Sequence, residues 1–353
     1  ALNYHQKALA IREKVLGENH PDTATSYNNI GSVYDFQGDY VEALNYHQKS
    51  LAIYESVLGE NHPDTAISYN NIGLVYNSQG DYAEALKYHQ KALAIREKVL
   101  GENHPDTATS YNNIGGVYYS QSDYAEALKY YEKAMAIREK VLGENHPDTA
   151  MSYNNIGVVY EKQGDYAEAL KYHQKALAIR EKVLGENHPD TATSYNNIGG
   201  VYYSQSDYAE ALKYYEKALA IEEKVLGENH PDIAALYYNI GFVYYSQGDY
   251  AEALKYYQKA LAIYERVLGE NHPLTATLYN NIGSVYYSQG NYVDALENYE
   301  KTLAIEENVL GENHPDTATS YYNIGGVCYS QGDYVEALNY HQKALAIREK
   351  VLG

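Results

Sequence analysis

Eight asparagine side chains recur at intervals of 42 residues, each two positions after a tyrosine and directly before Ile-Gly. They are Asn29, Asn71, Asn113, Asn155, Asn197, Asn239, Asn281 and Asn323. An asparagine amide carries two N–H donors and an acceptor oxygen, so it can hydrogen-bond a peptide backbone whatever the side chains of that peptide. A row of such amides on one surface would hold an extended peptide or partner segment without reading its sequence.

The same asparagines could instead hydrogen-bond a neighbouring helix and set the spacing between repeats, and the sequence leaves both interpretations open.

Three residues beyond each asparagine, the residue type varies between copies. Apolar side chains stand there in the second, fourth and sixth copies, as Leu74, Val158 and Phe242. They could form an apolar track of side-chain pockets beside the asparagines, or they could reflect neutral drift in a duplicated unit of two repeats.

Other residues with chemical potential do not form a catalytic pattern. Eight histidines in the sequence NHP lie one repeat apart, which is too far for shared metal coordination, so we assign them to linkers and caps. The motifs of nucleotide-binding loops, zinc proteases and serine hydrolases are missing from the sequence. The 44 tyrosines suit a core. We therefore expect a non-catalytic protein that needs no cofactor or metal.

The composition narrows the range of partners. Acidic residues outnumber basic ones 47 to 27, the formal net charge is −20, and no basic run occurs. Phosphate binding needs clustered Lys and Arg, so we expect no nucleic-acid partner and no membrane partner. The sequence has no signal-peptide pattern. Cys328 is the only cysteine, which rules out an intrachain disulfide and favours a reducing compartment, so we expect a cytoplasmic location.

The elements that would position these residues follow from a single repeat, residues 20–59. Pro21 suits the first position of a helix, and Gly38 suits a left-handed helix end. Asp39, with Glu42 three residues later, is typical of an N-cap. Each repeat is therefore predicted to consist of a helix A, a tight turn, a helix B and a short linker.

Two repeats depart from this turn pattern. Ser122 and Ser206 replace the glycine that ends helix A in the other copies. A left-handed backbone there would strain a residue that carries a Cβ atom. We therefore expect the turn to be locally less stable in those two repeats.

Helix B of the second repeat carries two apolar stripes, one through Leu86 and the other through Tyr88. A helix with two apolar faces needs two neighbours, so each helix B should pack on its own helix A and on the next one. The predicted fold is an all-α solenoid of antiparallel helix pairs. A lone helix B at residues 1–17 would precede eight 42-residue repeats at residues 18–353, forming one continuous array.

The repeat resembles the tetratricopeptide repeat (TPR), whose pattern is W-x2-L-G-x2-Y followed by A-x3-F. The matching residues here are Tyr27, Ile30, Gly31, Tyr34, Ala43 and His47. Its 42-residue length and the segments LGENHPD and AIREKVLG are similar to the kinesin light chain type. The resemblance implies a right-handed superhelix whose A helices line a concave groove, a role as a protein–protein interaction scaffold, and asparagines that clamp a peptide backbone.

A structural array that associates with itself is the alternative function. Residues 1–17 and 337–353 are identical, and the first copy lacks a preceding helix A while the second lacks a following one. The side chains expected to be uncovered are Leu2 and Leu9 at one end and Tyr340, Ala344, Ile347 and Val351 at the other. Such ends could join molecules head to tail through their terminal helices.

Overall fold

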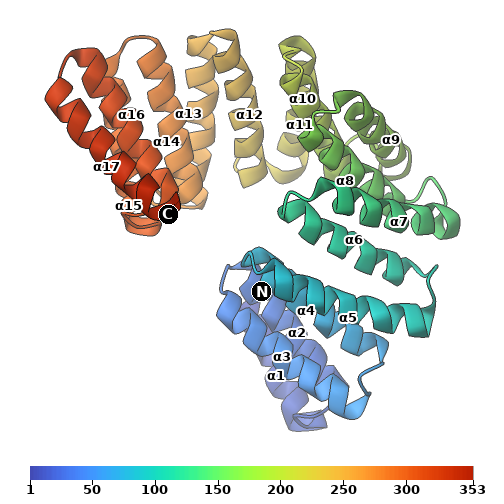
Figure 1. The fold of residues 1–353 in the computed structure, drawn as a ribbon. Coiled ribbons are helices and arrows are strands. Elements are labelled where there is room, and N and C mark those ends of the chain that lie inside the picture. The colour runs from blue at the N-terminus through green and yellow to red at the C-terminus, as the bar shows by residue number, and fades with distance from the viewer. Residues whose placement is uncertain (353) are drawn as a thin grey trace. The chain divides into compact units, whose positions relative to one another are not determined.

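The computed structural model describes residues 1–352, and every regular element in that range is an α-helix (Figure 1). The helices are α1 (Leu2–Leu16), α2 (Pro21–Phe36), α3 (Tyr40–Val57), α4 (Pro63–Ser78), α5 (Tyr82–Leu100), α6 (Pro105–Ser120), α7 (Tyr124–Leu142), α8 (Pro147–Gln163), α9 (Tyr166–Leu184), α10 (Pro189–Ser204), α11 (Tyr208–Leu226), α12 (Pro231–Gln247), α13 (Tyr250–Val267), α14 (Pro273–Ser288), α15 (Tyr292–Val309), α16 (Pro315–Gln331) and α17 (Tyr334–Leu352). The even-numbered helices are the predicted A helices, and the odd-numbered helices are the B helices. The all-α prediction is confirmed.

Each helix A begins at a proline that is capped by the histidine before it. In α2, Nδ1 of His20 accepts a hydrogen bond from the backbone N–H of Asp22 at 3.1 Å. The same cap recurs at all eight A helices. The NHP histidines therefore satisfy an orphan N–H of the first turn, which confirms their assignment to caps.

The turn between helices A and B has the predicted chemistry. Gly38 has φ of 76°, and Oδ1 of Asp39 accepts from the backbone N–H of Glu42 at 3.2 Å. Ser122 and Ser206 have φ of 61° and 62°, and they are the only non-glycine residues with positive φ in the described chain. The left-handed turn is thus kept where serine replaces glycine.

Within each unit, helix B of a repeat packs on its own helix A and, where another helix A follows in that unit, on that helix too, as predicted. The stripe that contains Ala92 and Ile95 of α5 packs on its own helix A, against Ala66 and Tyr69. The stripe that contains Leu86 has its counterpart in α7, where the same position packs with buried residues of the following helix, α8. The two apolar stripes therefore face opposite neighbours.

The prediction for the two ends assigned most of these side chains to the wrong stripe: of those expected to be uncovered, Val351 is exposed, whereas Tyr340 is half-buried and packs against α16. The exposed apolar side chains include Tyr4, Ile11 and Val15 in α1, and Leu338, Leu345 and Val351 in α17. Leu2 and Leu9 are half-buried because α2 covers their stripe. Ala344 and Ile347 are buried against α16.

Glycine in helix A permits the closest approach of the pair. A Cβ atom on Gly73 of α4 would lie 2.8 Å from the imidazole of His89 on α5. In the next repeat, a Cβ atom on Gly115 of α6 would lie 2.9 Å from the ring of Tyr131 of α7. These glycines end the segment Tyr-Asn-Asn-Ile-Gly, or Tyr-Tyr-Asn-Ile-Gly in two copies, which we call the YNNIG motif. The glycine of the motif is therefore required for packing against helix B.

The tyrosine of the motif ties helix A to the preceding helix B. The hydroxyl of Tyr111 donates to Oε1 of Glu97 at 2.5 Å, and that of Tyr27 donates to Oε1 of Glu13 at 2.7 Å. Burial, followed by this hydrogen bond to Glu13, raises the pKa of Tyr27 to about 12. The phenol therefore stays a donor at neutral pH.

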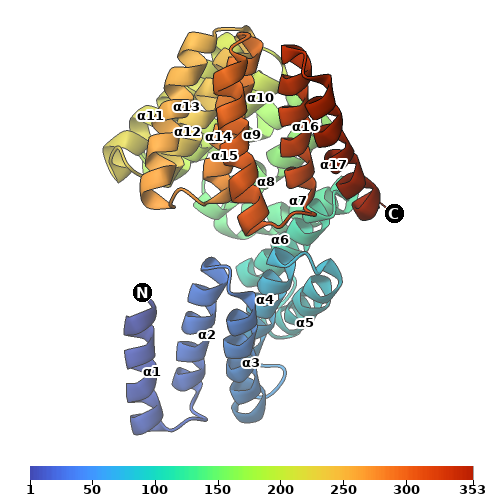
Figure 2. The same cartoon turned by 90° about the vertical axis from the view of Figure 1, so that its left-hand side faces the viewer.

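The chain forms two compact units, unit 1 at Ala1–Val183 and unit 2 at Leu184–Gly353. Within each unit, successive helix pairs stack side by side, as Figure 2 shows from α1 to α5. Among the described residues, none of the helices combines the length and apolar character that crossing a bilayer requires.

Candidate binding surface on the A helices

The predicted asparagines link successive A helices. Nδ2 of Asn113 on α6 donates to Oδ1 of Asn70 on α4 at 2.6 Å. The same bond joins Asn155 to Asn112 at 2.8 Å, Asn239 to Asn196 at 3.0 Å and Asn323 to Asn280 at 2.9 Å. The second asparagine of one motif therefore bonds the first asparagine of the motif one repeat earlier. We call the row of eight predicted asparagines the asparagine ladder. The spacing role has a direct structural basis at these four steps.

This bond leaves part of each amide available. Asn113 uses one of its two N–H groups, so the other N–H and the Oδ1 acceptor are not consumed by the link. A side chain oriented by its link to the neighbouring helix can still meet a ligand. The spacing role and the peptide-clamp role therefore do not exclude each other.

The other four predicted asparagines differ in burial. Asn29 is exposed on α2, while Asn71 on α4 and Asn197 on α10 are half-buried. Asn281 on α14 is also half-buried, but its Nδ2 atom is buried without a hydrogen-bond partner. The cause is Tyr238, which stands where other repeats have the first asparagine of the motif.

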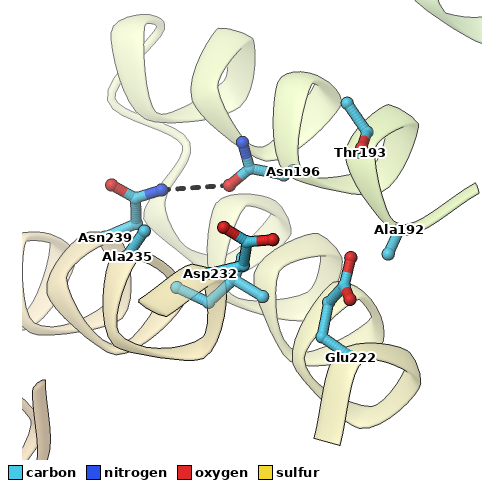
Figure 3. A pocket seen from close by; sticks show the side chains of 8 residues that line it. Ala192, Thr193, Asn196, Glu222, Asp232, Ala235 and Asn239 are labelled. Atoms are coloured by element: carbon cyan, nitrogen blue, oxygen red, sulfur yellow. Dashed lines mark hydrogen bonds between the residues drawn. The ribbon is translucent and has the colours of Figure 1, made fainter. Parts of the chain in front are cut away.

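In unit 2 the A-helix surface is hollowed into pockets beside the asparagines. The first, of about 290 Å³, lies between α10, α11 and α12 (Figure 3). It is lined by Ala192, Thr193, Asn196, Glu222, Asp232, Ala235, Leu236 and Asn239. A second pocket of about 290 Å³ is lined by Ala235, Tyr238, Asn239, Tyr264, Leu274 and Thr277. Asn239 and Ala235 are common to both, so the two pockets adjoin.

A third pocket in unit 2 is larger, at about 540 Å³, and strongly aromatic. It is lined by Tyr245, Ser284, Tyr287, Tyr299, Tyr322, Asn323, Gly326, Tyr329 and His341. The ladder residue Asn323 thus lies at a pocket while it donates to Asn280. The aromatic walls offer flat faces and hydroxyl groups to a bound segment.

The sequence analysis did not single out one position of helix B whose side chain points toward the next helix A. In α7 it is Arg138, which is only 2% exposed. Its Nη1 donates to Oγ of Ser152 at 2.8 Å and to the backbone oxygen of Asp148 at 3.4 Å. Burial lowers the pKa of Arg138, although Asp148 opposes the shift. The guanidinium fills the junction between two A helices.

In α11 the same position holds Glu222, which is 6% exposed. Its Oε2 atom is buried without a hydrogen-bond partner, since Leu236 stands where the Arg138 repeat has Ser152. Burial raises the pKa of Glu222, and Asp232 raises it further while His230 lowers it. The signal in the sequence was AIEEKVLG in this repeat instead of AIREKVLG.

A family model described as "Tetratricopeptide repeat" matches the chain in eight overlapping segments, the first at residues 1–56 and the last at 274–350. The chain belongs to the tetratricopeptide repeat family. The TPR prediction is therefore confirmed over the whole array. No curated protein matches the chain in sequence.

Solved structures share the TPR fold. BtubC (BKLC) from P. vanneervenii aligns with a TM-score of 0.57 and 24% identity, covering 66% of this chain and 92% of that one. A variant of a Podosopora anserina putative kinesin light chain with nearly identical TPR-like repeats aligns at 0.50 and 26%, covering 59% and 98%. A signal transduction ATPase with a TPR sensor, PH0952 from Pyrococcus horikoshii, aligns at 0.67 and 18%, covering 99% and 52%. The neighbours of this TPR array thus include kinesin light chain-like proteins.

The predicted apolar track is dispersed over these TPR helices. Leu74 on α4 is 39% exposed, and Val158 on α8 is half-buried. Phe242 on α12 stacks on Tyr238 with ring centroids 6.1 Å apart and tilts against Tyr203 at 5.2 Å. None of the three lines the pockets described above, so their role as side-chain pockets stays a prediction.

Buried histidines in the TPR core are packing groups of helix B. His47, His89 and His173 are almost fully buried, and burial lowers the pKa of each to about 4. Both ring nitrogens of His89 and of His173 lack a hydrogen-bond partner, whereas His47 bonds Asn28. In the described part of the chain, no three His, Cys, Asp or Glu side chains gather in a way that could hold a metal ion.

Proposed function

We propose that this TPR protein is a non-catalytic scaffold that binds an extended peptide or partner segment along its A helices. The observation that carries the proposal is the position of Asn239. Its amide is oriented by Asn196, and it stands at two adjoining pockets. One N–H and the Oδ1 acceptor of that amide remain for the backbone of a segment, and the pockets on either side offer room for its side chains.

Asn281 adds a second line of support. Its Nδ2 atom is a buried donor without a partner, which costs free energy unless a ligand or water satisfies it. A bound backbone carbonyl would remove that cost. Asn281 is linked to no earlier asparagine, so its substitution tests the peptide-clamp role without affecting the spacing role.

The test starts from random decapeptides displayed on phage and selected on the immobilised full chain. A selected peptide is then titrated against wild type, Asn239→Ala and Asn281→Ala by fluorescence anisotropy. Each lost hydrogen bond should weaken binding by about 0.5–1.5 kcal/mol. Asn271→Ala, an exposed linker position, is the matched control and should bind as wild type does.

Stability measurements on the same variants distinguish clamp from spacer. Asn239→Ala also breaks the bond to Asn196, so it should lower the urea midpoint. Asn281→Ala removes a buried donor that has no partner, so it should not lower that midpoint. Failure to select any peptide, or equal binding by all variants, would contradict the proposed function.

A self-associating array is the second candidate. The side chains that favour it are the exposed Tyr4, Ile11 and Val15 of α1 and Leu338 and Leu345 of α17. These apolar groups stand on faces that TPR packing covers elsewhere in the array. Light scattering over a wide concentration range should show mass rising with concentration if α17 of one molecule packs on α1 of another. A constant monomer mass would exclude this mode.

A further inference from the structure

The pocket between α10, α11 and α12 is lined by two carboxylates, and one of them, Glu222, is almost fully buried. Glu222 enters from α11 and Asp232 from α12, and Figure 3 shows both carboxylates turned toward α10. Thr193 and Asn196 of α10 form the opposite wall. No lysine or arginine lines the pocket, although two carboxylates do.

The corresponding junction two repeats earlier shows what this space accommodates. There, the guanidinium of Arg138 lies between Thr109 of α6 and Ser152 of α8, with Nη2 at 3.5 Å from Oγ1 of Thr109 and Nη1 at 2.8 Å from Oγ of Ser152. It also donates to the backbone oxygen of Asp148. The counterparts of Thr109, Asp148 and Ser152 in the pocket are Thr193, Asp232 and Leu236. The chain's own cation is therefore replaced by an anion, and about 290 Å³ is left open.

Glu222 makes the open pocket costly without a cation. It is 6% exposed, and its Oε2 atom has no hydrogen-bond partner. Burial, Asp232 and Asp190 all raise its pKa, whereas His230 lowers it. His230 lies nearer Asp232, at 3.4 Å between Nδ1 and Oδ2, so it is placed to offset that carboxylate when protonated. A cation beside Glu222 would relieve the cost of an unpaired buried carboxylate.

We propose that this pocket binds the guanidinium group of an arginine side chain from a partner segment, with Glu222 as its counter-ion. Guanidinium fits better than ammonium because its planar fork can bond a carboxylate through two N–H groups, and because an arginine fills the equivalent junction in unit 1. This inference rests on the proposed function, since Asn239 at the rim would hold the backbone of the same segment.

The direct test uses two small probes on the full chain. N-acetyl-L-argininamide and the neutral isostere N-acetyl-L-citrullinamide are titrated separately and followed by NMR. The arginine compound should bind at least about tenfold more tightly, since it alone forms charge-assisted hydrogen bonds. Glu222→Gln should reduce its affinity to that of the citrulline compound.

Glu306 provides a matched control within the same unit. It occupies the same helix position as Glu222, but its Oε2 already accepts from Oγ of Ser320 at 2.6 Å. Glu306→Gln should therefore leave binding of N-acetyl-L-argininamide unchanged. The double variant Glu222→Arg/Leu236→Ser restores the Arg138–Ser152 arrangement, so it should fill the pocket and abolish binding.

Equal affinity for the two probes, or binding that ignores Glu222→Gln, would overturn the inference. The two probes and the selected decapeptides together distinguish failure of this inference from failure of the proposed function. Selected decapeptides that bind the chain irrespective of arginine and of Glu222 would refute only the arginine pocket. Binding of N-acetyl-L-argininamide that depends on Glu222, without any selectable peptide, would refute only the scaffold role.

Discussion

Unit 1 and unit 2 use the same helix pair but close its junctions differently. In unit 1, Arg12, Arg96 and Arg138 reach across to the next helix A and donate to a serine hydroxyl at 2.8 Å. In unit 2, Glu222 and Glu306 stand at that position. The residue type at this position therefore separates junctions that the chain fills with its own cation from junctions that hold a carboxylate.

The partner residue on helix A determines the outcome of the change to glutamate. Glu306 faces Ser320 and accepts a hydrogen bond from it, whereas Glu222 faces Leu236 and leaves an oxygen unpaired. Loss of the serine and gain of the carboxylate together create the pocket. Neither change alone produces a buried unpaired anion, so the two positions should be considered as a pair.

The largest expected difference between the units is their response to acid. His47, His89 and His173 in unit 1 have pKa values of about 4 against an ordinary 6.5, so the unfolded chain binds more protons between these values. The contribution of these histidines to the free energy of unfolding is therefore fully present above pH 6.5. It is lost as the pH falls toward 4, by about 1–3 kcal/mol per histidine. In unit 2, tyrosine replaces histidine at three of the four corresponding positions, Tyr215, Tyr257 and Tyr299.

Hydrogen exchange read by mass spectrometry measures this prediction for each unit. Peptides from α5 should lose protection below pH 6.5, while peptides from α13 should lose less. The control variant His89→Tyr/Leu74→Gly recreates the Tyr131–Gly116 pair, in which a Cβ atom on the glycine would lie 3.6 Å from the tyrosine hydroxyl. The control variant should reduce the acid sensitivity of α5. Equal acid sensitivity of both units would show that the buried histidines are not its cause.

The second prediction converts a unit 1 junction to the unit 2 type. Arg138→Glu removes the hydrogen bonds to Ser152 and to the backbone of Asp148, and it buries a carboxylate beside Asp148. The free energy of unfolding should fall by about 3 kcal/mol. Urea denaturation measures the change. Lys140→Glu makes the same charge change at an exposed site of the same helix and should cost far less; similar losses would show that net charge, not the junction, is responsible.

The third prediction concerns the two glutamates of unit 2. Burial is the first cause that raises the pKa of both Glu222 and Glu306, but only Glu306 has a hydroxyl donor that opposes the shift. Glu222→Gln should therefore stabilise the protein at pH 7 by about 1 kcal/mol, whereas Glu306→Gln should be close to neutral. Urea midpoints compare the two. The gain from Glu222→Gln should shrink as the pH falls, because the native carboxyl protonates more readily than the unfolded one.

The helices and their turns could be predicted because the signals are local. Pro21, Gly38 and Asp39 act on the backbone beside them, so their roles do not depend on distant neighbours. The two apolar stripes of helix B could be recognised, but not assigned to a neighbour, since both are apolar. That is why Leu2 and Leu9 were wrongly expected to be uncovered.

The candidate site was predicted less completely. The second asparagine of each motif was found by its recurrence, but its bond to the first asparagine of the preceding repeat depends on how consecutive A helices are offset. Glu222 was missed because a charged residue in an amphipathic helix is normally expected in solvent. Comparing its repeat with the AIREKVLG copies would have identified the exchange, although not its burial.

The smallest effect tests whether the units are equivalent where their sequences are. Ser122 in unit 1 and Ser206 in unit 2 lie in identical segments and have φ of 61° and 62°. Replacing either serine by glycine relieves a left-handed strain of about 1 kcal/mol, part of which is offset by the greater freedom of glycine in the unfolded chain. Each variant should therefore gain about 0.5 kcal/mol, measured by urea denaturation and by local exchange at the turn. Since turn geometry is the same, the gains should match within error. A gain in one unit alone would mean that the units differ in local cooperativity, and that the contrast between them extends beyond the arginine and glutamate junctions.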